Sequence, residues 1–127
     1  MPTYVSSGQT AYIDGTNDTY SVLSGGSLIV RDLVPNTMLN GNNDNAGYLL
    51  LTSNTTAYYI LTWSGGTTSI LGSANLAAAS SGGIINISSG GQVGSSHLIS
   101  DSKETIFSGG ALSSATVESG AELTVAS

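Results

Sequence analysis

The chain has 127 residues, of which 39% are hydrophobic and only 8% are charged, and its formal net charge is -6. This length fits one domain or a run of small repeats. The low charge excludes a charge-rich disordered chain and a helical bundle, whose surface needs many Glu, Lys, Arg and Gln residues. The two basic residues, Arg31 and Lys103, are too few for a phosphate-binding surface, so we expect neither a nucleic-acid partner nor binding to an anionic membrane.

The beginning of the chain shows no export signal. Residues Met1 to Gly8 have neither the basic start nor the apolar centre of a secretory signal peptide. The longest apolar runs, such as Leu76–Ala79, are too short to cross a bilayer. We therefore expect a cytoplasmic protein without membrane insertion.

Residues 4–33 are predicted to form the N-terminal coils of a repetitive β structure. The turn pairs Ser7-Gly8 and Ser24-Gly25 are 17 residues apart. Short segments between such turns, including Tyr20–Val22 and Leu28–Val30, are rich in residues that favour strands.

Residues 34–63 depart from this pattern. The stretch 36–46 is rich in Asn and is predicted to be a loop. Two aromatic strands are expected after it, over 47–53 and 56–63, either as irregular coils or as a lateral hairpin packed on the rest. The aromatic residues of this segment are either buried as the widest part of the core or candidates for a lateral contact with another subunit or with a glycan: Tyr48, Tyr58, Tyr59 and Trp63.

Residues 64–127 carry the strongest signal, a repeat of 19 residues. Three consecutive blocks span 71–89, 90–108 and 109–127, and apolar residues recur at matched positions in them. Alternation of apolar and polar residues inside each block indicates short strands with one buried face. The repeat predicts an all-β fold, a single-stranded β-solenoid of about six short coils with an irregular central insertion. The expected core residues are Ala74, Ala79, Ile87, Val93, Leu98, Ile106, Leu112, Val117, Leu123 and Val125.

The repeats that begin at Ser89-Gly90-Gly91 and Ser108-Gly109-Gly110 resemble those in the passenger domains of AIDA-type autotransporter adhesins. The resemblance covers 65–127 well and 4–33 loosely. It implies a right-handed β-helix, a surface or self-association role, and a secreted or cell-surface location as the alternative to the cytoplasm. The 127 residues are fewer than such adhesins have.

No group of residues predicts catalysis, a cofactor or a metal site. His97 is the only histidine, and we expect it to be an outward-facing polar residue without a catalytic partner. Asp101 and Glu104 flank Lys103 and are expected to form a solvated charge cluster. Asp44 is a single carboxylate in an Asn-rich stretch, and one carboxylate is too few for a calcium loop.

Both ends of the predicted solenoid lack a visible cap. Open solenoid ends carry unpaired backbone groups that can pair with another chain. We therefore expect head-to-tail assembly into filaments, a contact that does not close into a ring. The alternative is an adhesin or glycan-binding module, whereas the threonines do not form the regular array of an ice-binding solenoid. The residues expected to mediate self-association are Tyr4, Val5, Leu112, Val117, Leu123 and Val125.

Overall fold

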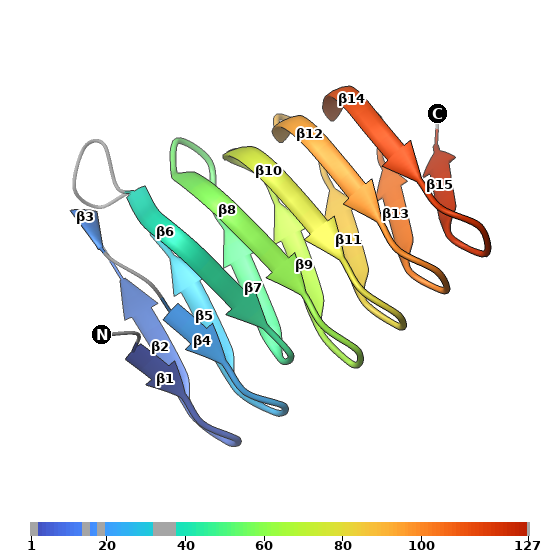
Figure 1. The fold of residues 1–127 in the computed structure, drawn as a ribbon. Coiled ribbons are helices and arrows are strands. Elements are labelled where there is room, and N and C mark those ends of the chain that lie inside the picture. Colours follow the sequence, from blue (N-terminus) through green and yellow to red (C-terminus); the bar gives the residue numbers. More distant parts are fainter. Residues whose placement is uncertain (1–2, 14–15, 18–19, 32–37, 127) are drawn as a thin grey trace.

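The computed structural model describes residues 3–13, 16–17, 20–31 and 38–126, and in these residues it is all-β without a helix. The chain winds back and forth between two parallel sheets that lie face to face (Figure 1). Each pass adds one strand to each sheet, beside the strand of the preceding pass. This arrangement is a β-solenoid, as the repeat predicts.

The first sheet has eight strands and the second has seven. The first sheet contains β1 (Thr3–Val5), β3 (Thr16–Asn17), β4 (Tyr20–Val22), β6 (Met38–Asn45), β8 (Thr56–Thr62), β10 (Ser73–Ala79), β12 (Gln92–Leu98) and β14 (Ala111–Val117). The second sheet contains β2 (Thr10–Ile13), β5 (Ser27–Val30), β7 (Tyr48–Leu51), β9 (Thr67–Ile70), β11 (Ile84–Ile87), β13 (Lys103–Ile106) and β15 (Glu122–Val125).

The register of the strands confirms the predicted alignment of the repeat. Ala74 lies beside Val93, and Val93 lies beside Leu112. In the second sheet Ile87, Ile106 and Val125 form one column in the same way. Along the path from β1 to β14 the first sheet has seven strands, one for each coil, which is close to the expected number of about six coils.

The core lies between the two sheets, where alternate residues of each strand point inward. Most of the expected core residues are buried, among them Ala79, Ile87 and Leu98. Four expected core residues are only partly buried or exposed, namely Leu112, Val117, Leu123 and Val125. All four belong to the last coil, which has a neighbouring coil on one side only.

The Ser-Gly-Gly steps form turns between the two sheets, and their two glycines are required for different reasons. Gly65 has a φ of 81°, a backbone conformation that favours glycine. A Cβ atom on Gly66 would instead lie 2.3 Å from the carbonyl oxygen of Asn45 in the preceding coil. The first glycine therefore makes the turn, and the second lets neighbouring coils approach each other.

The central segment is part of the solenoid, so the predicted loop over 36–46 is wrong for residues 38–45. These residues form β6, which pairs with β4 on one side and with β8 on the other. Residues 34–37 lie outside the described residues. The expected strands are present as β7 and β8, but they belong to different sheets and do not form a hairpin. The irregularity that remains is a register shift between Leu39 and Asn42.

Candidate self-association surfaces at the two ends

The C-terminal end exposes residues that continue the apolar core. Val117 extends the inward-facing column of Ala79 and Leu98, and Val125 extends the column of Ile87 and Ile106. Val117 is 44% exposed and Val125 is 73% exposed, whereas Leu98 is fully buried. Burying one valine side chain stabilises an association by about 1.5–3 kcal/mol. This end is therefore an apolar surface bordered by the open edges of β14 and β15.

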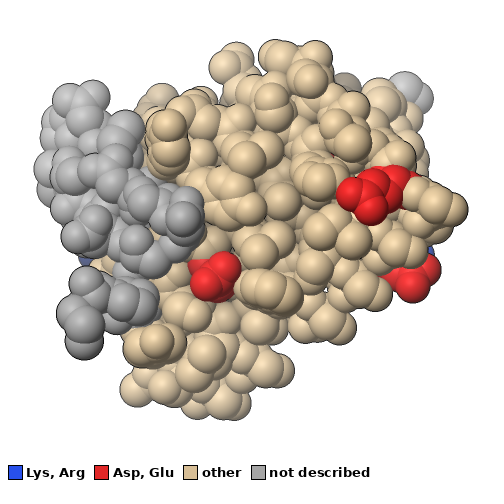
Figure 2. All heavy atoms as spheres, viewed as in Figure 1, with Lys and Arg blue, Asp and Glu red and all other residues tan. Residues whose placement is uncertain are grey.

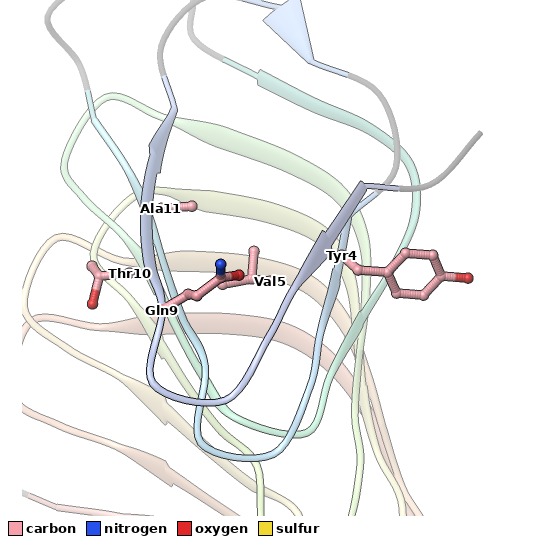
Figure 3. Close-up of a pocket in the computed structure, with 5 residues that line it drawn as sticks. All are labelled: Tyr4, Val5, Gln9, Thr10 and Ala11. Carbon is pink, nitrogen blue, oxygen red and sulfur yellow. The ribbon is translucent and has the colours of Figure 1, made fainter.

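The N-terminal end has a hollow between β1 and β2. It has a volume of about 350 Å³ and is lined by Tyr4, Val5, Gln9, Thr10 and Ala11 (Figure 3). Val5, Gln9 and Ala11 point into this space, whereas Tyr4 points away from it. Val5 is only 2% exposed, so it contributes less open surface than its counterpart Val117.

The turn of the first coil and the turn of the last coil have the same backbone hydrogen bond, but only the turn of the first coil has an additional side-chain hydrogen bond. At the C-terminal turn, residues Glu118 to Ala121 form a β-turn closed by a hydrogen bond from the Ala121 N–H to the Glu118 carbonyl. At the N-terminal turn, the Gln9 N–H donates to the Ser6 carbonyl in the same way. Here the Gln9 side chain also accepts a hydrogen bond of 3.0 Å from the Ser6 N–H. Sequence reasoning did not identify Gln9, although it is a large side chain where the related turns have small ones.

The aromatic residues proposed for a lateral contact do not form one cluster. Tyr48 lies on the outer face of the second sheet, whereas Tyr58 is exposed on β8 in the first sheet. Tyr59 is half-buried beside Leu76. Trp63 lies in the turn after β8, where its indole N–H donates to a carboxylate oxygen of Asp44 at 3.2 Å. The segment therefore presents aromatic groups on different sides of the molecule.

Charged side chains are sparse on the surface. The face in Figure 2 is almost entirely uncharged, with acidic groups in a few separate places. A carboxylate does lie beside the histidine, contrary to the expectation, because the Glu118 side chain is 2.6 Å from the His97 imidazole. Both side chains are nearly half exposed. This pair is an interaction between neighbouring coils.

The predicted solvated cluster around Lys103 is wrong for Glu104. This side chain faces the interior and is 1% exposed, because it alternates with Lys103 along β13. Its carboxylate accepts a hydrogen bond of 2.8 Å from the Ser96 hydroxyl across the core. Lys103 instead lies 3.6 Å from Glu122 of the next coil on the outer face.

The described residues contain no cluster of three or more potential metal ligands. In the same part of the chain, no helix has the length and apolar character needed to cross a membrane. No protein-family model matches the sequence, and no curated protein and no solved structure matches it significantly.

Proposed function

We propose that the protein is a structural subunit that assembles head to tail through its two end coils into filaments. The observation that carries this proposal is the exposure of Val117 and Val125, which lie in columns that are buried in the preceding coils. A first coil of a second copy, placed on the last coil of the first copy, would continue both sheets. The parallel pairing used throughout the molecule would then extend across the interface.

One register fits this contact. Val5 and Ile13 are separated by eight residues, as are Val117 and Val125. Placing Val5 on Val117 puts Ile13 on Val125, and the turn at Ser7-Gly8 then lies over the turn at Ser119-Gly120. This register adds ladder hydrogen bonds worth ~0.5–1.5 kcal/mol each. Burial of the apolar side chains in the two columns also stabilises the contact. Together with the hydrogen bonds, it opposes the free-energy cost of association.

Charge favours this pairing over a contact between two C-terminal ends. The last coil carries Glu118 and Glu122, whereas the strands β1 and β2 carry no charged residue. In the head-to-tail register Glu122 would lie over Thr10. Two C-terminal ends would instead bring their carboxylates together, and like charges destabilise such a contact.

The substitution Val125→Lys tests the proposal. Lysine at this position would place an ammonium group in the core column of the filament, where no partner is available. We expect the critical concentration for assembly, measured by light scattering, to rise by at least about 30-fold, which corresponds to the ~2 kcal/mol of one buried valine.

Thr124→Lys is the matched control, because Thr124 is the adjacent residue on β15 and lies on the outer face. It adds the same charge to the same strand, and we expect it to change the critical concentration by much less. Electron micrographs of the wild type should show filaments. A wild type that remains monomeric at high micromolar concentration would contradict the proposal and favour an adhesin or glycan-binding module.

A further inference from the structure

The backbone hydrogen bonds between coils follow a rule at the end of each first-sheet strand. The first turn residue donates its N–H to the carbonyl of the residue that ends the strand of the preceding coil. Six described pairs obey this rule, with distances of 2.7–2.9 Å: Leu23 to Val5, Ala46 to Val22, Trp63 to Asn45, Ser80 to Thr62, Ile99 to Ala79, and Glu118 to Leu98.

Ser6 occupies the same position in the first coil. Its N–H donates to the Gln9 side-chain oxygen at 3.0 Å. The Gln9 carboxamide therefore takes the place that a strand-end carbonyl of a preceding coil would occupy. In the proposed filament this carbonyl would be that of Val117 in a second copy.

The position of Gln9 in its turn is restricted to small residues in every later coil. Its equivalents, which follow from the turn-closing bonds and the inter-coil register, are Gly26, Gly47, Gly66, Gly83, Ser102 and Ala121. A Cβ atom on Gly26 would lie 2.5 Å from the Val5 carbonyl oxygen, and one on Gly83 would lie 2.5 Å from that of Thr62. Ser102 and Ala121 each carry a Cβ atom and still stack on the preceding coil, so this corner also admits a short side chain. None of the equivalent residues has a side chain as long as that of Gln9.

We propose that Gln9 blocks the N-terminal end of the free subunit and must move outward before a second copy can stack there. This inference rests on the proposed head-to-tail assembly and adds to it a residue that controls the contact. The partner is the last coil of a second copy of this chain. In that contact the Val117 carbonyl of the second copy would accept a hydrogen bond from the Ser6 N–H. Stacking exchanges the bond within the turn for a bond between subunits, and the Gln9 side chain leaves the hollow shown in Figure 3.

The substitution Gln9→Ala tests this inference, because alanine is already accommodated at the equivalent position in the last coil. It removes the carboxamide and keeps the Cβ atom. We expect the critical concentration for assembly to fall about three- to tenfold relative to the wild type, the factor that corresponds to one neutral hydrogen bond. Gln92→Ala on β12 makes the same chemical change away from both ends and should leave the critical concentration unchanged.

A second measurement separates the role of Gln9 from the proposed head-to-tail assembly. In dilute subunits, hydrogen exchange of the Ser6 amide, followed by nuclear magnetic resonance, should be several-fold faster in Gln9→Ala than in the wild type. If the wild type forms filaments but Gln9→Ala has the same critical concentration, or the same Ser6 exchange rate, the role of Gln9 is wrong and the assembly stands. If neither protein assembles at any concentration, the proposed function fails and the inference fails with it.

Discussion

Glu104 is a carboxyl group held inside the core, between Ile85 of the preceding coil and Leu123 of the following coil. Burial raises the pKa of Glu104 above its usual value, and the hydrogen bond from Ser96 opposes this rise. One carboxylate oxygen, Oε1, is buried and has no hydrogen-bond partner among the described residues. The folded protein therefore favours the neutral acid at this position.

A raised carboxyl pKa makes stability depend on pH in a defined direction. The contribution of protonated Glu104 is fully present below the ordinary carboxyl pKa of 4.5 and is lost as the pH rises through the raised value. The free energy of unfolding, measured by urea denaturation, should fall as the pH rises above 4.5. In Glu104→Gln this fall should become smaller, because the amide does not ionise.

The control for this prediction is Glu122→Gln, which alters an exposed carboxylate of the neighbouring strand. It removes the same charge but should keep most of the pH dependence of the wild type. Equal pH profiles for the wild type and Glu104→Gln would show that burial of Glu104 does not govern this dependence.

The burial of Glu104 follows from strand alternation, which the sequence already contains. In the run from Lys103 to Ile106, Glu104 has the same parity as Ile106, whose side chain points inward. The charge of Glu104 led to the opposite interpretation. The hydrogen bond that Glu104 accepts from Ser96 depends on a side chain eight residues away across the core, which the repeat pattern does not specify.

At the scale of elements, β6 is joined to its neighbours by buried polar side chains. The Asn45 amide donates to the Thr68 hydroxyl at 2.9 Å and to the Thr67 carbonyl at 2.8 Å. Its oxygen accepts from the Gly47 N–H at 3.0 Å, and the hydroxyls of Thr62 and Thr68 are 2.7 Å apart. These bonds link the two sheets through the interior, so each member depends on the others for its hydrogen-bond partners.

The substitution Asn45→Ala should destabilise the protein by about 2–4 kcal/mol, because it leaves several buried polar groups without a partner. The measurement is the free energy of unfolding from urea denaturation. Asn75→Ala is the matched control, since Asn75 is an exposed asparagine on β10, and it should cost less than about 1 kcal/mol. A cost for Asn45→Ala no larger than that of the control would show that the network does not stabilise β6.

The regular strands could be predicted from sequence because their apolar residues alternate and recur every 19 residues. β6 could not be predicted in this way, since asparagine and glycine are typical of turns. Its structure depends on the neighbours β4 and β8, which provide backbone partners, and on Asn43, whose side chain binds the Tyr20 N–H at 2.8 Å. Tertiary contacts therefore determine this element against its local composition.

At the scale of the whole molecule, the two ends are unequal. The C-terminal end exposes Val117 and Val125, whereas Val5 at the N-terminal end is buried and Gln9 occupies the hollow beside it. The strands β14 and β15 of this end were predictable, because the last 19-residue block matches the interior blocks. The Gln9 contact was not predictable, since it depends on a side-chain conformation in one turn.

The most direct test of head-to-tail assembly is X-ray fibre diffraction from aligned filaments of the wild-type protein. Each subunit contributes seven layers along the path from β1 to β14. With a spacing of about 4.8 Å between neighbouring strands, the account predicts a meridional reflection at this spacing and an axial subunit repeat of about 34 Å. Filaments that lack the subunit repeat, or solutions that contain only monomers, would contradict it.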